Sequence, residues 1–304
     1  MRVDFVILPI GQYRDGFAGN PAVGPATGKR GERGSMTRDS TSTRLQPQSM
    51  LVSLLGQSVE VALHEHPSAT DTILLLHEAL GSVGYWKDFP EKLALATGAN
   101  VLLYSRAGQG KSEGPIAPRN RESYLREAHE VIPSLLAHFH VEYPVLYGHS
   151  EGAGLGMLYA AISQRVKMLV LESPFVIARE SSRTHIRSMA ATYHGSRLQQ
   201  RLALYHRNPD EVFFSWVEGV GGFSDGESPF GQFISGISCP VLVLQGANDE
   251  FGTTQHLNAI VSALPDVEHE TFADTGHLPH RQCTEGVLER VSRFLASKRT
   301  ATTV

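Results

Sequence analysis

The sequence predicts an α/β protein with a mostly parallel, twisted sheet that carries helices on both faces. From residue 51 onward, short apolar runs alternate with amphipathic stretches of helical length. Parallel strands need long crossover connections, usually helices, so this alternation indicates a parallel sheet. The first two apolar runs are separated only by a turn, which predicts an antiparallel hairpin at one edge. A length of 304 residues with 41% hydrophobic residues fits one large domain of this class.

The expected elements follow in chain order. LVSLL and SVEVALHE form the hairpin, joined by a turn at Gly56-Gln57. Further strands are expected at residues 72–76, 100–104, 144–147, 167–172, 240–245 and 267–272. Helices are expected at residues 86–97, 121–138, 152–164, 254–264 and 285–298.

Two segments depart from this alternation. Residues 1–49 are rich in Gly, Pro, Ser, Thr and Arg and lack a sustained apolar period, so we expect a disordered extension, with a targeting segment as the alternative. Residues 175–236, the inserted segment, contain helix-like stretches but no clear strand, and we expect a lid over the active site. The core is then expected at residues 50–174 and 237–300. The aromatic rings of the inserted segment are expected mainly to pack it onto the core, with a substrate pocket as the alternative: Phe175, Tyr193, His194, Phe213, Phe214, Trp216 and Phe223.

Composition excludes several classes of function. Lys plus Arg number 27 against 31 Asp plus Glu, and no basic stripe is present, so we expect no nucleic-acid partner. Two cysteines allow at most one bridge and give neither a disulfide framework nor a four-ligand zinc site. No apolar run reaches the roughly 18 residues of a membrane span, and none resembles a signal-peptide core. We therefore expect a cytoplasmic protein that acts on a small molecule, while its oligomeric state stays open.

The strongest motif is GHSEG at residues 148–152, which matches the pattern G-x-S-x-G. It follows the strand-like PVLY and precedes the helix-like GAGLGMLYAA. A sharp strand-to-helix turn of this kind needs small flanking residues, and it presents the serine hydroxyl at the carboxyl ends of the strands. Ser150 is therefore the candidate nucleophile. The N–H of Glu151, at the start of the helix, is placed to donate to a developing oxyanion.

A serine hydroxyl is a weak nucleophile until a base removes its proton. His277 and His280 both lie in the loop after the last expected strand, and we favour His277 because it immediately follows Gly276. Asp249 lies at the carboxyl end of the strand VLVLQ, where a carboxylate can orient the imidazole. Glu250 is the alternative for the acid.

Residues 51–298 resemble the α/β-hydrolase superfamily, of the esterase and C–C-hydrolase-like kind. The resemblance rests on the hairpin, on HEALGS, YSRAGQGKS, GHSEG, GANDE and TGHLPH, and on the chain order Ser, Asp, His. It implies that the N–H of Ala79 is the second oxyanion donor, with Leu80 as the alternative. Where relatives usually have His-Gly, this chain has His77-Glu78. We expect the Glu78 side chain to turn away from the pocket, with a role in pocket polarity as the alternative.

The resemblance also implies a reaction. A small or medium ester, thioester or lactone is expected to be cleaved through an acyl-enzyme, with no metal or organic cofactor. The alternatives are a C–C bond hydrolase or cofactor-free oxygenase of the same fold, or a ligand-binding protein without turnover. GKS at residues 110–112 is similar to a phosphate-binding loop, but position 105 is Ser rather than Gly. The resemblance instead gives Arg106 and its neighbouring glycines a structural role in a turn.

Overall fold

The computed structural model describes residues 45, 47–227, 229–251 and 254–301. The disordered extension expected at residues 1–49 lies almost wholly outside the described residues. Its last residues belong to the sheet, because strand β1 (Gln48–Leu54) begins inside the expected extension. Before this strand, the buried Leu45 donates its N–H to the Glu91 carboxylate at 3.1 Å.

The described residues form one eight-stranded sheet in the order β1-β2-β4-β3-β5-β6-β7-β8. β1 and β2 are antiparallel to their neighbours, and the other six strands are parallel. This arrangement confirms the predicted fold class. After β1 the strands are β2 (Gln57–His64), β3 (Thr72–Leu76), β4 (Asn100–Tyr104), β5 (Val145–His149), β6 (Met168–Glu172), β7 (Val241–Gly246) and β8 (Val267–Phe272).

The hairpin turn lies one residue earlier than the sequence suggested. Leu54 pairs with Gln57, so the turn residues are Leu55 and Gly56, and Gln57 already belongs to β2. Both turn residues have positive φ, 51° and 79°. A two-residue turn with positive φ at both positions follows the right-handed twist of the strands that it joins. Gly56 adopts this conformation without steric cost.

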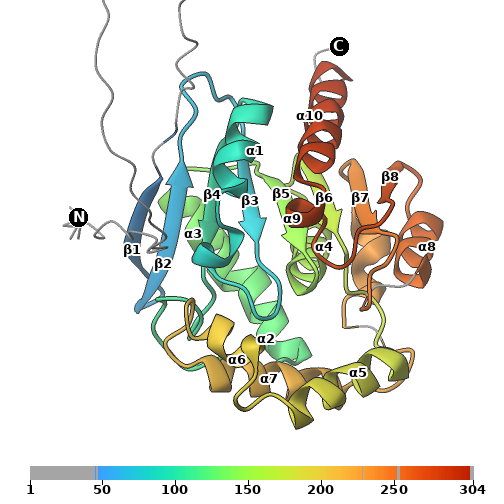
Figure 1. Ribbon diagram of the computed structural model, residues 1–304. Coiled ribbons are helices and arrows are strands. Elements are labelled where there is room, and N and C mark those ends of the chain that lie inside the picture. Colours follow the sequence, from blue (N-terminus) through green and yellow to red (C-terminus); the bar gives the residue numbers. More distant parts are fainter. Residues whose placement is uncertain (1–44, 46, 228, 252–253, 302–304) are drawn as a thin grey trace, which may run out of the picture. The chain divides into compact units, whose positions relative to one another are not determined.

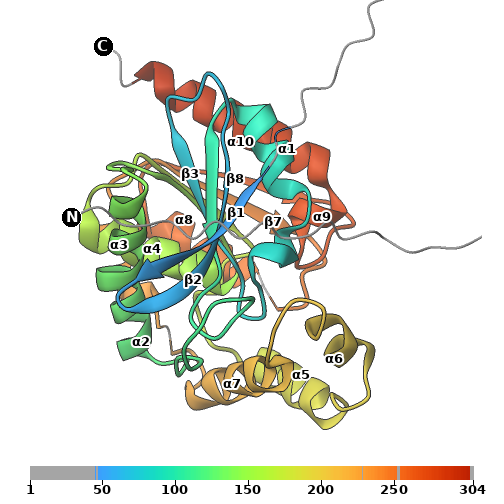
Figure 2. The ribbon, with the colours of Figure 1, turned by 90° about the vertical axis from the view of Figure 1, so that its left-hand side faces the viewer.

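Helices cover both faces of the sheet (Figures 1 and 2). α1 (Phe89–Thr97) and α10 (Thr284–Ala301) pack on one face, beside the short α9 (Pro279–Gln282). The other face carries α2 (Arg121–Arg126), a π-helical turn (Glu127–Val131), α3 (Ile132–His138), α4 (Glu151–Ser163) and α8 (Thr254–Ala263). β3 is buried between the two layers: Leu74 packs into one apolar cluster, and Ile73 and Leu75 pack into the other. Such burial explains the continuous apolar run of a central parallel strand.

The inserted segment contains three helices, α5 (Glu180–Ala191), α6 (Arg197–Leu202) and α7 (Pro209–Gly222), and a 3₁₀ turn (Gly231–Gly236). The three helices gather at the carboxyl edge of the parallel strands, at the bottom of Figure 1. Tyr193 and Phe213 stack with ring centroids 3.8 Å apart inside a small apolar cluster of this segment. Cys239 and Cys283 are both free. Within the part of the chain that the structure describes, no helix is both long and apolar enough to cross a membrane.

The order of the strands creates a crevice at their carboxyl edge. From β3 the chain crosses to β4 on one side, whereas β5 pairs with β3 on the other side. The loops after β3 and β5 therefore diverge, and ligands of open α/β sheets bind at such switch points. Ala79 follows β3 and Ser150 follows β5, so both lie at this crevice.

Replacement of Leu74 by Ala tests the burial of β3. The side chain has 0% exposure, so the truncation leaves a cavity, and we expect a loss of about 2–5 kcal/mol in the free energy of unfolding. Urea denaturation measures the loss. Leu204→Ala is the control, because this side chain is 76% exposed and its removal should change stability by less than about 0.5 kcal/mol. Equal losses in the two variants would contradict the described core.

Candidate active site

Ser150 occupies a strained turn between β5 and α4. Its φ of 54° and ψ of −114° are unusual for a residue other than glycine. Both ends of the motif require glycine: a Cβ on Gly148 would lie 2.3 Å from the Gly152 carbonyl oxygen, and a Cβ on Gly152 would lie 2.1 Å from the Leu76 carbonyl oxygen. The Ser150 N–H donates to the Glu172 carbonyl at 2.9 Å. Backbone packing therefore holds Ser150 in this conformation.

His277 pairs with Asp249 across the loops that follow β8 and β7. The Nδ1 atom lies 2.8 Å from Asp249 Oδ1 and 3.0 Å from Oδ2. The Asp249 side chain is wholly buried and also accepts hydrogen bonds from Gln245 Nε2 at 2.7 Å and from the Phe251 N–H at 2.9 Å. A carboxylate with these donors acts as an acceptor, so Nδ1 of His277 carries the proton and Nε2 is left to accept one.

Charge around His277 favours its protonated form. Burial opposes the charge, but the hydrogen bond and charge of Asp249 outweigh burial and raise the pKa of His277 above its ordinary value. The carboxylates of Glu78 and Glu250 act in the same direction. The imidazole therefore gains stabilisation when it takes up a proton, as a general base must.

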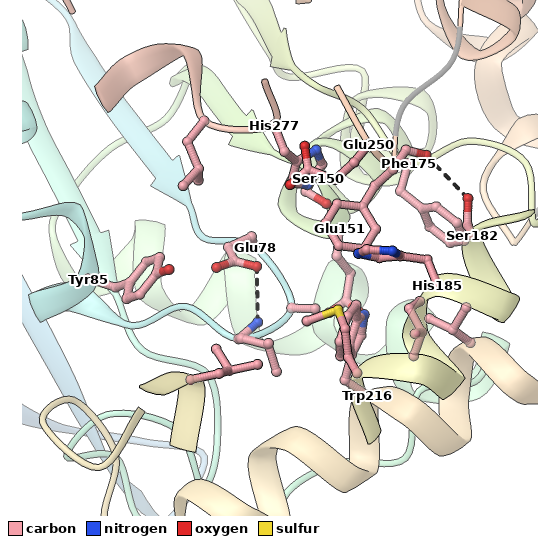
Figure 3. A pocket seen from close by; sticks show the side chains of 18 of the residues that line it. Glu78, Tyr85, Ser150, Glu151, Phe175, Ser182, His185, Trp216, Glu250 and His277 are labelled. Carbon is pink, nitrogen blue, oxygen red and sulfur yellow. Dashed lines mark hydrogen bonds between the residues drawn. The ribbon is translucent and has the colours of Figure 1, made fainter. Parts of the chain in front are cut away.

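Ser150 and His277 line one cavity of about 230 Å³ together with Ala79 and Glu151 (Figure 3). These are four of the five site residues expected from the sequence, and the fifth, Asp249, lies behind His277. The rest of the wall is mostly apolar and comes largely from the inserted segment, including Phe175, Ile186, Met189, Leu198, Leu202 and Trp216. Two of the aromatic rings named from the sequence, Phe175 and Trp216, thus face the cavity, whereas Tyr193 and Phe213 pack within the segment.

Glu78 differs from the expectation that its side chain turns away. It lines the cavity, and its carboxylate accepts the Leu80 N–H at 3.3 Å, the bond drawn in Figure 3. The two residues are only two positions apart, and a polar side chain can accept a hydrogen bond from the backbone N–H two residues later in a turn. Leu80 therefore has an internal partner for its N–H. The Ala79 N–H donates no hydrogen bond among the described residues.

Glu151 lines the cavity, and its carboxylate belongs to a buried ionic cluster. Arg106 Nη1 lies 2.7 Å from Oε1, Arg119 also binds Oε1, and the Tyr124 hydroxyl donates to Oε2 at 3.2 Å. Burial would raise the pKa of Glu151, but Arg119 and Arg106 outweigh burial and lower it. Arg106 lies two residues after the end of β4, which is a usable signal in sequence, whereas Arg119 lies in an irregular loop that gives none.

His280, the competing base, has a different environment. It is buried, and its Nδ1 lies 2.9 Å from Oε1 of Glu172, which also accepts the His280 N–H at 2.7 Å. The Tyr147 hydroxyl donates to the same carboxylate at 2.8 Å. Burial would raise the pKa of Glu172, but His280 and His149 outweigh burial and lower it to about 2.

His149 connects this buried cluster to the cavity wall. Its Nε2 lies 2.8 Å from the His277 carbonyl oxygen, and burial lowers the pKa of His149 to about 3, so the ring is neutral and donates. His149, Glu172 and His280 have ligand atoms within 4.8 Å of one another, the one such group of metal-ligating types among the described residues. Hydrogen bonds join Glu172 to His280, and the His149 ring packs against the His280 ring with centroids 5.1 Å apart.

Comparison with known proteins agrees with this architecture. A family model described as alpha/beta hydrolase fold matches residues 71–215. A protein of Azorhizobium caulinodans named as a carbamate hydrolase, RutD, is 33% identical over 109 residues, which are 36% of this chain and 39% of that protein. The chain thus matches well under half the length of this curated relative.

Solved structures are similar over most of their length. An alpha/beta hydrolase fold protein from Chitinophaga pinensis superposes with a TM-score of 0.66 at 15% identity, covering 84% of this chain and 98% of that one. The enol-lactonase from Burkholderia xenovorans LB400 superposes with a TM-score of 0.63 at 19% identity, covering 81% and 99%. At these identities the likeness concerns the fold.

Replacement of Glu78 by Gln tests the electrostatics of the cavity. Loss of the carboxylate removes a charge that favours the imidazolium, so the pKa of His277 should fall. Histidine titration by NMR measures the change, and His277→Gln assigns the signal. Glu289→Gln is the control, because that exposed side chain lies on α10 away from the cavity lining. An unchanged or raised pKa in Glu78→Gln would contradict the described position of Glu78.

Proposed function

Because the chain belongs to the α/β-hydrolase superfamily, we propose that it is a serine hydrolase that cleaves small or medium esters, thioesters or lactones through an acyl-enzyme. The observation that carries the proposal is the pairing of His277 with the wholly buried Asp249, in a cavity that His277 shares with the strained Ser150. Nucleophile, base and orienting acid are the three parts that this chemistry requires.

The first half-reaction forms the acyl-enzyme. Ser150 Oγ attacks the carbonyl carbon while its proton passes to Nε2 of His277, and the carbonyl oxygen takes up the negative charge. Asp249 stabilises the resulting imidazolium through Nδ1. The N–H groups of Ala79 and Glu151 stabilise the oxyanion. The intermediate collapses, the bond to the leaving group breaks, and His277 returns the proton to the leaving atom.

The second half-reaction releases the acid. A water molecule loses a proton to Nε2 of His277 and attacks the acyl carbon, giving a second oxyanion in the same hole. Collapse breaks the bond to Ser150 Oγ, which recovers the proton from His277. This cycle needs only groups of the chain and water.

The side chains that the inserted segment contributes to the cavity favour a substrate with an apolar acyl group. We propose residues 175–236 as a cap, because their apolar side chains line the cavity that Ser150 also lines. A volume of about 230 Å³ suits a small or medium group. The names of the similar proteins add an enol lactone and a carbamate to the substrates worth testing.

Replacement of Ser150 by Ala tests the nucleophile. We expect fluorophosphonate labelling to vanish and the hydrolysis of p-nitrophenyl butyrate to fall by a factor on the order of 10⁴ or more, since the covalent route is lost. The melting temperature, measured alongside, should not decrease, because Ser150 holds a strained backbone conformation in which its hydroxyl makes no hydrogen bond among the described residues.

The test distinguishes this function from its competitors. Labelling that persists in Ser150→Ala would refute the assigned nucleophile. Labelling confined to Ser150, without turnover of esters, thioesters, lactones or carbamates, would favour a C–C bond substrate. An assay with a vinylogous 1,5-diketone would then test that activity. Folded wild type that is never labelled would favour a ligand-binding protein.

Replacement of Asp249 by Asn tests the acid. The amide can donate to Nδ1, which favours the wrong imidazole tautomer, and we expect kcat to fall by about 10³–10⁴-fold. Steady-state kinetics measure the loss. Glu250→Gln is the matched control, because Glu250 lines the cavity without a hydrogen bond to the His277 ring, and it should lose less than about tenfold. A larger loss in Glu250→Gln than in Asp249→Asn would transfer the role to Glu250.

A further inference from the structure

We propose that Arg119 is a positioning residue that holds both donors of the oxyanion hole with one guanidinium group. The inference rests on the proposed function, in which the N–H groups of Ala79 and Glu151 bind the oxyanion. Arg119 Nη2 donates to the Ala79 carbonyl at 2.8 Å, and Nη1 binds the Glu151 carboxylate. The side chain is buried, with 8% of the residue exposed. One rigid fork thus joins the loop after β3 to the first residue of α4.

Side chains from elsewhere in the chain bind the carbonyl groups of the loop after β3. The Glu78 carbonyl accepts from Arg106 Nη2 at 2.7 Å, the Ala79 carbonyl from Arg119 and from Gln109 Nε2 at 2.8 Å, and the Leu80 carbonyl from His206 Nε2 at 3.0 Å. Side chains from other parts of the chain therefore hold three successive carbonyls. The conformation of this loop is fixed from outside.

The direction of the Ala79 N–H follows from the planarity of the peptide group. In a trans peptide the N–H points away from the preceding C=O, and the structure contains no cis peptide among its described residues. The Glu78 carbonyl is bound to the buried Arg106, so the Ala79 N–H points to the opposite side. The next peptide is fixed through the Ala79 carbonyl, which Arg119 holds. Together the two arginines fix the peptide planes on both sides of Ala79.

The other donor is held through its own side chain. Glu151 is the first residue of α4, where the N–H groups lack helical partners. Its carboxylate is anchored by Arg119, by Arg106 and by the Tyr124 hydroxyl. Arg106 joins the Glu78 carbonyl to the same carboxylate, but Arg119 is the arginine that binds Ala79 and Glu151 together, so it links the two residues that supply the donors. An oxyanion hole works only when both donors are in place before the reaction.

Helix α7 of the inserted segment packs directly against Arg119. A Cβ on Gly219 would lie 2.0 Å from Arg119 Cβ and 2.6 Å from its Cγ, so no larger residue fits there without displacing the arginine. Gly221, two residues later in the same helix, has no atom within 4 Å of its ideal Cβ position. Substitution of Gly219 by Ala would therefore displace Arg119 without removing a polar group. The same substitution at Gly221 is the matched control.

The experiment measures oxyanion stabilisation apart from substrate binding. The fluorophosphonate oxygen occupies the oxyanion hole, so its second-order labelling rate reports on the hole, and kcat and KM for p-nitrophenyl butyrate report on turnover and binding. For Arg119→Met we expect the labelling rate and kcat to fall about 10–10³-fold with KM within about twofold of wild type. Arg119→Lys keeps the charge without the fork and should lose activity similarly. Rates are normalised to the folded fraction measured by circular dichroism.

The glycine pair keeps the inference testable if the arginine variants do not fold. Gly219→Ala should lower the labelling rate and kcat at least about fivefold with KM nearly unchanged, whereas Gly221→Ala should keep both, since alanine is the better helix former. Wild-type labelling rates in folded Arg119→Met or in Gly219→Ala would overturn the role of Arg119 and leave Ser150 as nucleophile. Wild type that is not labelled at Ser150 would overturn the proposed function, and this inference with it.

Discussion

The site depends on the close approach of backbone at the turn between β5 and α4. The Gly152 position meets the carbonyl of Leu76 at the end of β3, and the Gly148 position meets the Gly152 carbonyl, so neither can carry a side chain. This contact brings the start of α4 against the end of β3. It places Ser150 at positive φ and brings the N–H of Glu151 near the loop that contains Ala79. The backbone contact therefore comes first, and the side chains of the site are arranged around it.

Around this backbone contact lie buried polar side chains, whose hydrogen bonds must come from other groups of the protein. Burial of a lone carboxylate is costly, and here each buried carboxylate has several donors: Glu151 has two arginines and a tyrosine, and Glu172 has His280 and Tyr147. Removal of one member leaves the others buried with fewer hydrogen bonds or less compensating charge, which is costly. These clusters therefore stabilise one arrangement of the loops around Ser150 and disfavour the alternatives.

Much of the fold follows from local sequence patterns. The strands at residues 72–76, 100–104 and 267–272 begin and end where the sequence predicts, and the first two are apolar runs bounded by polar or turn residues. β5 extends two residues beyond the prediction, since Gly148 and His149 of the serine turn still pair with β6. Ser150 and His277 reach one cavity because the carboxyl ends of parallel strands share one edge of the sheet. The positions of these residues could be predicted without knowledge of any side-chain contact.

The contacts that separate one histidine from another could not be predicted in this way. His277 and His280 lie three residues apart after the same strand, and each pairs with a carboxylate, at 2.8 Å and 2.9 Å. Their partners, Asp249 and Glu172, follow or end different strands, which no local pattern in the sequence connects to one histidine or the other. The pairs differ in access: His277 lines the cavity, whereas His280 is enclosed between Glu172 and the ring of Trp86. A histidine–carboxylate pair is common to both, so under the proposed function it is access to the cavity, rather than the pair itself, that distinguishes His277 as the base.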